Sequence, residues 1–415
     1  MANIIPFRAY RYTAAAGAPL TNLVTQPYDK ISPAMRADYL RKSPYNLVRI
    51  ILGEPAGSDS ASDNVYTRAA TYLTDWIRQG ILAADDAPGF YPYSQEFADL
   101  DTGETLTRKG LIALGEVTAY SEGIVHRHEE TLSGPKKDRL ALLNHAKAHF
   151  GQIFMLYEDA AAAVDQLVDR AAGAPPLGEA EDEYGVRHRL WRITDPATLS
   201  EIHASMADKQ LIIADGHHRY ETALNYRREN GGEDARFVMM TLVNMRTPGL
   251  RILATHRVLH GVAGLDRAKI LGGLAGLGEL TLEGPHEFRA RLARREESHI
   301  TLGVALPGEE QVHVLRAARA PGELDVSFLH EKLFAARYGI TAETVRDHSY
   351  IDYVRGAEAA MATAHQGRAQ AAFLLQATRI DEVSAVVRAG GVMPQKSTDF
   401  YPKLLSGMTV YKLGG

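Results

Sequence analysis

A short segment in the middle of the chain joins an apolar run, a glycine turn and a helix-like pattern. Residues 211–214 are apolar and are typical of a short buried strand, and Asp215-Gly216 is typical of a tight turn. From about residue 218 to 228, apolar and long side chains recur at helical spacing. The segment therefore predicts a strand that turns directly into a helix, so strands and helices must alternate in this part of the fold.

The predicted turn carries an unusual concentration of polar side chains. A strand that turns through glycine into a helix directs several backbone N–H groups and the positive end of the helix dipole at one place, which suits a phosphate. Arg219 adds a forked charged donor, and His217 and His218 can exchange a proton near neutral pH. We predict a ligand site at residues 215–219. The alternative is an ordinary turn followed by a helix with a surface arginine.

Length and composition limit the kind of protein. A chain of 415 residues exceeds one ordinary core, so two or three domains are expected. The hydrophobic fraction of 45% and charged fraction of 23% are those of a globular protein in water. The formal net charge of −5 argues against a general nucleic-acid binder, because such a protein needs a basic surface.

Other classes are excluded by what the sequence lacks. No apolar run approaches the roughly 20 residues that span a bilayer, and the N-terminal segment is not typical of a signal peptide. We therefore expect a cytoplasmic protein without a membrane partner. The chain has no cysteine, which excludes disulfides, thiol nucleophiles and cysteine-ligated zinc.

The first hundred or so residues have the pattern of an accessory domain with helices and strands. We predict helices at residues 33–41 and 64–79, the second stopped by Gly80. Residues 46–53 predict a strand that ends at a glycine, and two Tyr- and Leu-rich runs predict a hairpin with arms at 90–97 and 107–117.

A loop rich in His and Glu follows the hairpin and precedes a predicted helix at 138–148. It contains His126 and His128 and the adjacent carboxylates Glu129 and Glu130. Either glutamate is a candidate general base if the fold brings it near the Asp215 turn. A solvated charged loop is equally compatible. A third interpretation is a histidine metal site that also uses His217 and His218.

The second half of the chain predicts alternating strands and helices. Strands are expected at 152–157, 188–193, 237–243 and 252–259, and helices at 160–172, 197–207 and 380–389. In the strand 252–259, Thr255, His256 and Arg257 cannot all point into a core, so we expect one face to meet water or a ligand. From about residue 263, a third domain of helices and strands is expected.

The last informative segment is a loop between glycines and prolines near the C-terminus. Lys396 stands next to the hydroxyl residues Ser397 and Thr398. One ammonium group and two hydroxyl donors can hold an anion, so this loop is a candidate contact for a substrate.

Three of these segments together resemble the free-serine kinases. They are the Asp-Gly-His-His-Arg turn at 215–219, the pair His128-Glu129, and the loop that runs from Pro394 through Lys396, Ser397 and Thr398 to Pro402. The resemblance implies an α+β (mixed α/β) fold with a nucleotide-binding core like that of ParB and sulfiredoxin at residues 108–262. Residues 1–107 would form the accessory domain, and 263–415 a C-terminal α/β domain with a substrate-covering loop at 392–403.

The same resemblance implies an activity and assigns roles to residues. The protein would transfer a phosphoryl group from ATP or ADP to the hydroxyl of free L-serine, a small hydroxy-amino acid, with Mg²⁺ as cofactor. The residues implied, or expected from the patterns above, are Glu129 and His128 for catalysis, Asp215, Gly216, His217, His218 and Arg219 for the nucleotide phosphates, Asp215 for Mg²⁺, and Lys396, Ser397, Thr398, Thr255, His256 and Arg257 for the substrate.

Two other functions remain open from the residues alone. One is a ParB-like nucleotide switch or NTPase, although a net charge of −5 and the lack of an evident basic helix disfavour contact with DNA. The other is a metallohydrolase in which His126, His128, His217 and Asp215 surround a metal-bound water.

Overall fold

The computed structural model describes residues 2–100, 102–129, 134–341, 343–344 and 350–414. Its residues form two compact units, each with helices and β-sheet. Unit 1 comprises residues 1–127, 131–250 and 402–415, and unit 2 comprises residues 128–130 and 251–401. The expected mixed α/β class is therefore confirmed.

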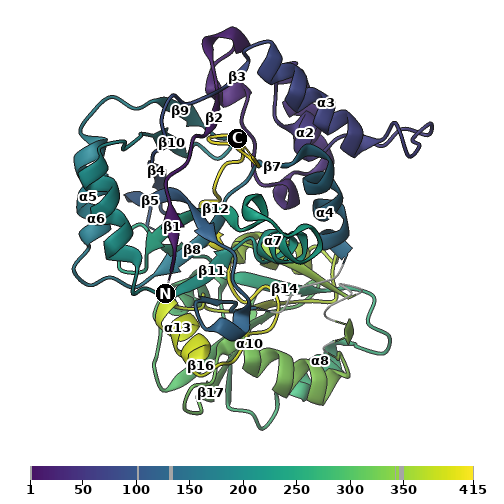
Figure 1. Cartoon of the computed structure of the whole chain (residues 1–415). Helices are drawn as coiled ribbons and strands as arrows, with labels where there is room; N and C mark the ends of the chain where they lie inside the picture. The colour runs from purple at the N-terminus through teal and green to yellow at the C-terminus, as the bar shows by residue number, and fades with distance from the viewer. Residues whose placement is uncertain (1, 101, 130–133, 342, 345–349, 415) are drawn as a thin grey trace. The chain divides into compact units, whose positions relative to one another are not determined.

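Unit 1 is built on a nine-stranded mixed sheet (Figure 1). In spatial order its strands are β6 (Val125–His126), β11 (Leu211–Asp215), β8 (Ile153–Tyr157), β12 (Phe237–Asn244), β5 (Thr105–Glu116), β4 (Tyr91–Ala98), β10 (Arg187–Leu190) and β9 (Gly178–Glu181), with β1 (Ile4–Ile5) also paired to β5. Strand β11 runs parallel to β6, and β8 runs parallel to β12, whereas the other neighbours are antiparallel.

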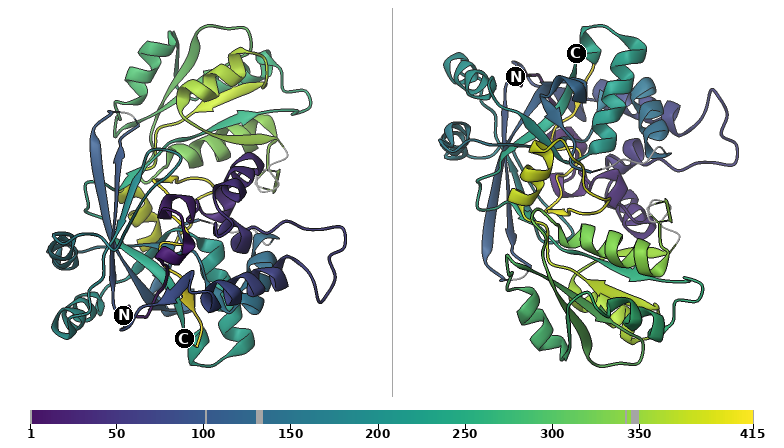
Figure 2. Two further views of the ribbon diagram at one scale, coloured as in Figure 1. Left: turned by 90° about the horizontal axis from the view of Figure 1, so that it is seen from above. Right: turned by 90° about the horizontal axis from the view of Figure 1, so that it is seen from below.

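Helices of unit 1 bury their apolar sides on this sheet. Helices α5 (Ala163–Ala172) and α6 (Pro196–Met206) lie side by side, as Figures 1 and 2 show. Their apolar residues join those of the strands and of α7 (His217–Asn230) in one core. Asp195 caps α6 by accepting the Thr198 N–H at 2.9 Å.

The helices α1 (Pro33–Lys42), α2 (Val48–Ile51), α3 (Val65–Arg78) and α4 (Gly134–Ala146) belong to the same unit. The predicted helix at 64–79 is confirmed by α3. Asn64 starts it with a reciprocal cap, in which its side chain accepts the Thr67 N–H at 3.1 Å and the Thr67 hydroxyl accepts the Asn64 N–H at 2.9 Å.

The predicted strand at residues 46–53 is wrong, because this run forms the short helix α2. The Asn46 side chain accepts the Val48 N–H at 2.9 Å and so favours a helical turn. Val48, Ile50 and Ile51 are all buried. An apolar run without polar alternation cannot distinguish a buried strand from a buried helix, and here the bond between Asn46 and the Val48 N–H favours the helix.

Short elements complete unit 1. They are the strands β2 (Tyr10–Tyr12), β3 (Leu82–Ala84), β7 (Ala148–His149) and β21 (Tyr411–Lys412), and the short 3₁₀ helices η1 (Ala14–Ala16), η2 (Leu20–Asn22), η3 (Tyr28–Lys30), η4 (Tyr120–Glu122) and η5 (Glu233–Ala235). Strand β2 pairs with β3, and β7 pairs with β21. The C-terminal segment is therefore an integral part of unit 1.

Unit 2 is built on a six-stranded antiparallel sheet with helices. Its strands, in spatial order, are β15 (Glu279–Glu283), β17 (Val312–Ala318), β16 (His299–Ala305), β19 (Ala371–Leu374), β14 (Thr255–Leu259) and β18 (Ile351–Arg355). Its helices are α8 (Arg267–Leu274), α9 (Pro285–Leu292), α10 (Asp325–Ser327), η6 (Phe328–Tyr338), α12 (Ala357–His365) and α13 (Ile380–Arg388). The neighbours Val258 and Leu259 lie in different core clusters, so both faces of the sheet are covered.

The predicted strand at 252–259 is divided in two. Residues Arg251–Ile252 form β13, which pairs with β20 (Phe400–Tyr401), and Thr255–Leu259 form β14. Strand β14 lies between β18 and β19 and is buried on both faces, so His256 and Arg257 are each only 2% exposed. The expectation that one face of this strand meets water fails because a central strand can be covered on both sides.

The three consecutive segments expected as domains differ from the two units. The boundary expected between residues 107 and 108 falls inside β5, which carries the hydrogen bonds of the hairpin with β4. Residues 251–262, expected in the core, belong to unit 2. A hairpin cannot be divided between domains without breaking its hydrogen-bond ladder, so the boundary implied by the resemblance does not separate two units here.

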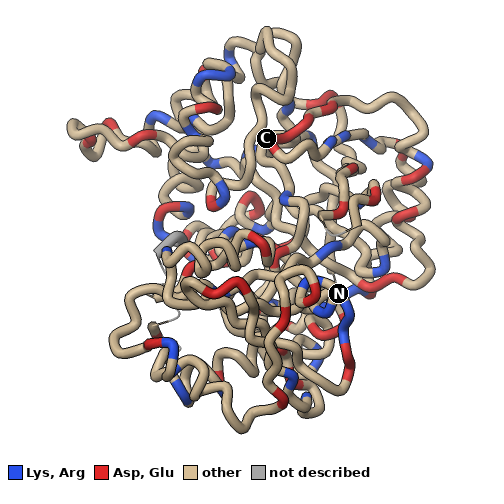
Figure 3. The backbone as a smooth tube through the Cα atoms, turned by 180° about the vertical axis from the view of Figure 1, so that it is seen from behind, with Lys and Arg blue, Asp and Glu red and all other residues tan. Residues whose placement is uncertain are grey.

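Charged residues of both signs are interspersed along the backbone (Figure 3). Among the residues that the structure describes, none of the helices has the length and apolar character needed to cross a membrane.

Candidate functional site

The Asp215 turn has the predicted strand–turn–helix geometry. Strand β11 ends at Asp215, Gly216 takes a left-handed conformation with φ +95°, and α7 begins at His217. Gly216 N–H donates to Asp215 Oδ1 at 3.0 Å, and Tyr220 N–H donates to Gly216 O at 3.0 Å. Because the residue before α7 is glycine, no side chain from that position caps the first turn.

Basic side chains surround the Asp215 carboxylate. Its Oδ2 lies 3.5 Å from Arg219 Nη2 and 3.7 Å from Lys403 Nζ. Burial acts to raise the Asp215 pKa, but the charges of Lys403, Arg219, Lys30 and His217 outweigh it and hold the pKa well below its ordinary value. Asp215 is therefore an ionised carboxylate at neutral pH inside a cluster of cations.

Two buried polar residues, Gln95 and Arg108, hold the segment that carries Lys403 in place. Lys403 O accepts Gln95 Nε2 at 2.7 Å, and Pro402 O accepts the Arg108 guanidinium. Arg108 Nε also donates to Gln95 Oε1 at 3.0 Å, and its guanidinium lies 4.5 Å from the centre of the Phe154 ring. Arg108 is 1% exposed, and burial lowers its pKa to about 9. These contacts set the position of the Lys403 ammonium beside Asp215.

Sequence reasoning did not identify Lys403, Lys30 or Arg108 as part of this site. Lys403 closes the loop that was singled out for Lys396, and its neighbour Pro402 was part of the motif. Arg108 stands between Thr107 and Lys109 in a predicted strand arm, so the sequence does not mark it as buried. Only Lys403 had a signal in the sequence, whereas Arg108 and Lys30 had none.

Arg219 lies directly against the glycine turn. A Cβ on Gly216 would lie 3.0 Å from Arg219 Nε and 3.1 Å from its Cζ. The guanidinium also donates to Gln152 O. Glycine at 216 is therefore needed both for its positive φ and for the space that Arg219 occupies. His217 and His218 follow in the first turn and are half-buried, and His218 O accepts the Thr222 hydroxyl at 2.7 Å.

In unit 2, Glu129 and His128 pack against the C-terminal loop. Met393 N–H donates to His128 O at 2.8 Å, and Thr398 N–H donates to Glu129 Oε1 at 2.9 Å. The Thr398 hydroxyl also donates to Glu129 Oε1 at 2.9 Å, and its Oγ1 lies 2.7 Å from His128 Nε2. Since the hydroxyl proton points to Glu129, His128 Nε2–H donates to Thr398 Oγ1. Glu130, the other candidate base, lies outside the described residues.

The hydroxyls expected to contact a substrate form hydrogen bonds within unit 2. Ser397 Oγ donates to Pro394 O, and Ser397 O accepts the Thr378 hydroxyl at 2.8 Å. Thr398 holds Glu129, as described above. Lys396 is exposed and takes a positive φ of 58°. Of the three residues predicted for the substrate in this loop, Lys396 is the one with its side chain directed to solvent.

Arg257 supports the same loop from β14. Its Nη2 donates to Lys396 O at 3.0 Å, and its guanidinium also donates to Thr255 O and lies 5.3 Å from the centre of the Tyr353 ring. Burial lowers the Arg257 pKa to about 10, although the charges of Tyr353 and Glu129 act to raise it. His256 Nδ1 accepts the Leu375 N–H at 3.2 Å. Arg257 and His256 thus have structural partners, and contact with a substrate stays a prediction.

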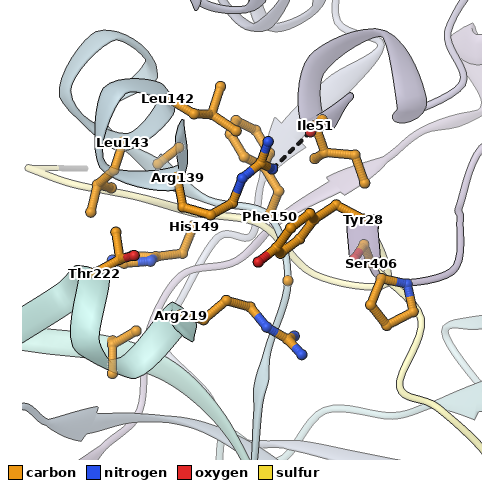
Figure 4. Close-up of a pocket in the computed structure, with 14 residues that line it drawn as sticks. Tyr28, Ile51, Arg139, Leu142, Leu143, His149, Phe150, Arg219, Thr222 and Ser406 are labelled. Carbon is orange, nitrogen blue, oxygen red and sulfur yellow. Dashed lines mark hydrogen bonds between the residues drawn. The ribbon is translucent and has the colours of Figure 1, made fainter. Parts of the chain in front are cut away.

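Next to Arg219, unit 1 contains a hollow of about 600 Å³, a volume that includes the open space at its entrance (Figure 4). Most of its wall is apolar, and Arg219, Arg139 and Tyr28 form a polar side. Its lining residues are Pro27, Tyr28, Ile51, Arg139, Leu142, Leu143, Ala148, His149, Phe150, Gly151, Arg219, Thr222, Val238 and Ser406. No sequence pattern indicates this pocket, because its walls come from segments far apart in the chain.

The predicted histidine metal site has no support in this structure. Within the described part of the chain, there is no group of three or more His, Asp or Glu side chains placed to hold a metal ion. His126, His217 and Asp215 belong to unit 1 and His128 to unit 2.

Comparison with known proteins yields one family and several distant structures. A family model described as "Protein of unknown function (DUF1015)" matches residues 4–330. No curated protein matches the sequence significantly.

Solved structures similar to the chain share little sequence with it. A free serine kinase in complex with AMP is 12% identical, with a TM-score of 0.36 over 69% of this chain and 89% of that chain. A conserved hypothetical protein from Pyrococcus furiosus is 14% identical (TM-score 0.35, 69% and 92% covered), and SbnI with a C-terminal truncation from Staphylococcus aureus is 12% identical (TM-score 0.36, 72% and 87% covered). TM-scores in this range do not establish a shared fold.

Proposed function

The chain belongs to the DUF1015 family of proteins of unknown function, and we propose that it is a phosphotransferase that uses ATP or ADP to phosphorylate the hydroxyl of a small molecule. Free L-serine is the first candidate acceptor. The observation that carries the proposal is the Asp215 turn, where a helix N-terminus, Arg219 and Lys403 surround one ionised carboxylate.

This turn supplies what phosphoryl transfer requires from a protein. The reaction depends mainly on positioning and on neutralising the phosphate charge, so N–H donors, an arginine and a lysine are suitable groups. The first turn of α7 provides N–H groups, and Arg219 and Lys403 provide charges that are held in place by Gln152 and by Gln95 with Arg108. We assign the nucleotide phosphates to residues 215–219 and Lys403.

Asp215 fits the role of a Mg²⁺ ligand. Mg²⁺ in such sites is bound by one or two carboxylates together with phosphate oxygens, and the lowered Asp215 pKa keeps this carboxylate ionised. When bound, Mg²⁺ would neutralise negative charge on the phosphates. Asp215, between Arg219 and Lys403, is the residue that would hold it.

We assign Glu129 as the general base. Thr398 fixes its Oε1 through two hydrogen bonds, and His128 in turn orients the Thr398 hydroxyl. In the proposed step, Glu129 takes the proton of the acceptor hydroxyl while the acceptor oxygen bonds to the terminal phosphorus. The bond from that phosphorus to the bridging oxygen of the nucleotide breaks, and the shortened nucleotide leaves.

The direct test is an assay of the purified protein with Mg²⁺, ATP or ADP, and a panel of hydroxy compounds led by L-serine, followed by ³¹P NMR. We expect O-phosphoserine with one of the two donors. Nucleotide binding without transfer to any acceptor would replace the proposal with a nucleotide switch. Stoichiometric zinc, iron or manganese that remains bound through purification would favour a metallohydrolase.

The variant Glu129→Gln tests the role of the base. We expect turnover to fall by about 10²- to 10⁴-fold, because the amide cannot accept the proton, while ADP binding stays unchanged. Stopped assays give the rate, and calorimetric titration gives the affinity. The matched control is Glu201→Gln, on the exposed side of α6, which should leave both quantities unchanged. Full activity in purified Glu129→Gln would remove Glu129 from the mechanism.

A further inference from the structure

The hollow beside Arg219 lies within unit 1 and has no role in the proposed mechanism so far. It is formed by α4, by the segment that follows it through Gly151, and by the first turns of α7, with Tyr28, Ile51 and Ser406 from other segments. Arg219 and Thr222, three residues apart, lie on the same face of α7. The hollow therefore runs along the first turns of the helix whose N-terminus we assign to phosphate.

The wall of the hollow has two chemically different sides. Leu142, Leu143, Ala148, Phe150 and Val238 make one side apolar. On the other side Tyr28 lies between Arg139 and Arg219, as Figure 4 shows. The Arg139 guanidinium stacks on the Tyr28 ring at 4.1 Å from its centre and donates to Ile51 O at 2.8 Å.

Two arginines give the hollow its polar side. The described lining residues include Arg139 and Arg219 and neither Asp nor Glu, and Arg139 is also paired with the Asp138 carboxylate. Burial raises the Tyr28 pKa, Asp29 and Asp138 act in the same direction, and Arg219 and Arg139 act to lower it. His149 stacks on Tyr411 at a centroid distance of 6.0 Å, and burial lowers its pKa to about 4, so it is neutral at pH 7.

We infer that this hollow binds the base and ribose of the nucleotide, with the phosphates at Arg219 and the turn. This inference rests on the proposed function. An apolar wall with a few polar groups at one end is the usual composition of small-molecule sites. Arg219 links the two parts, because it lines the hollow and also lies 3.5 Å from Asp215.

The inference predicts that the affinity for a nucleotide exceeds the affinity for its phosphates alone. We would titrate ADP and pyrophosphate separately into the full-length protein with Mg²⁺ by calorimetry. Wild type should bind ADP at least about tenfold more tightly than pyrophosphate. In Leu142→Trp, the larger ring should fill the hollow, so ADP affinity should fall to that of pyrophosphate while pyrophosphate affinity stays within about twofold of wild type.

Two further variants make the result decisive. Lys137→Trp places the same side chain on an exposed position of α4 and should change neither affinity. If Leu142→Trp does not fold, Tyr28→Ala serves instead, since Tyr28 is half-buried at the wall, and it should weaken ADP more than pyrophosphate.

The outcomes separate the two proposals. If wild type binds ADP and pyrophosphate equally, or if Leu142→Trp binds ADP as wild type does, the nucleoside pocket is refuted and the phosphate site stands. If wild type binds neither ligand, the proposed function itself fails.

Discussion

Thr398 uses both its backbone and its side chain on a single carboxylate oxygen. The N–H and the hydroxyl each donate to Glu129 Oε1 at 2.9 Å, and the hydroxyl accepts from His128. A hydroxyl has one proton, so the donor and acceptor roles of this small network are fixed. Thr398 is therefore a positioning residue for Glu129.

The variant Thr398→Val tests this role, because valine has nearly the same shape and no hydroxyl. Losing a hydrogen bond to a charged group of about 1.5 kcal/mol or more should lower kcat by at least about tenfold, with little change in KM for the nucleotide. Steady-state kinetics measure both. Thr398→Ser keeps the hydroxyl and should restore most of kcat. A wild-type kcat in Thr398→Val would show that the backbone N–H alone positions Glu129.

At this scale the sequence identified residue types better than their directions. The hydroxyl pair Ser397-Thr398 was predicted to contact a substrate, but a sequence does not show where a hydroxyl points. In the structure both hydroxyls bond within unit 2, to Pro394 O and to Glu129. Lys403, which the sequence pattern did not indicate, has its Nζ 3.7 Å from Asp215 Oδ2.

At the level of elements, the strand–turn–helix at 211–230 was predictable because its signals are local. The apolar run, the glycine and the helical spacing all lie within residues 211–228. The same reasoning failed for residues 46–53, where the Asn46 side chain accepts the Val48 N–H and the chain forms a helix. It also failed for 252–259, where pairing with two different sheets divides the strand. The second outcome depends on partners distant in sequence.

The Gly216 turn gives a prediction at this scale. In Gly216→Ala, alanine must adopt a positive φ, and its Cβ would lie 3.0 Å from Arg219 Nε. The free energy of unfolding should therefore fall by about 1–3 kcal/mol, and Arg219 must move. We expect ADP affinity to fall by about tenfold or more. Urea unfolding and calorimetric titration measure the two effects.

Gly231 provides the matched control at the other end of α7. It also has a positive φ, of 60°, but a Cβ there would meet nothing within 4 Å. Gly231→Ala should therefore lose stability without losing ADP affinity. Equal loss of affinity in both variants would show that Gly216 acts through general stability, and that Arg219 is not its specific partner.

Over the whole molecule, the chain enters unit 2 twice and ends in unit 1. His128 and Glu129 belong to unit 2 although residues of unit 1 stand before them and from residue 134 onward, and residues 402–414 return to unit 1. Composition changes along a sequence can locate consecutive domains, but they do not indicate that so short a segment joins another unit. For the same reason the wall of the hollow, which comes from several distant segments, could not be foreseen.

Buried histidines make both units sensitive to acid. Burial lowers the pKa of His149 in unit 1 to about 4, and that of His256 in unit 2 to about 4, from an ordinary value of about 6.5. As the pH falls below about 6.5, each of these histidines becomes protonated in the unfolded chain, whereas in the folded chain it stays neutral until about pH 4. Each histidine therefore contributes a loss of stability as the pH falls through this window, and none above it.

His256→Asn isolates one of these contributions, since asparagine can still accept the Leu375 N–H but does not titrate. Between pH 7 and pH 5, wild type should lose about 2 kcal/mol more than the variant in the free energy of opening of β14, measured by hydrogen exchange of residues 255–259. Trp76 and Trp191 both lie in unit 1, so their fluorescence in urea should show the same pH dependence in both proteins. An equal loss at β14 in wild type and variant would mean that His256 is already protonated in the folded chain, and the acid sensitivity of unit 2 would then have to come from another group.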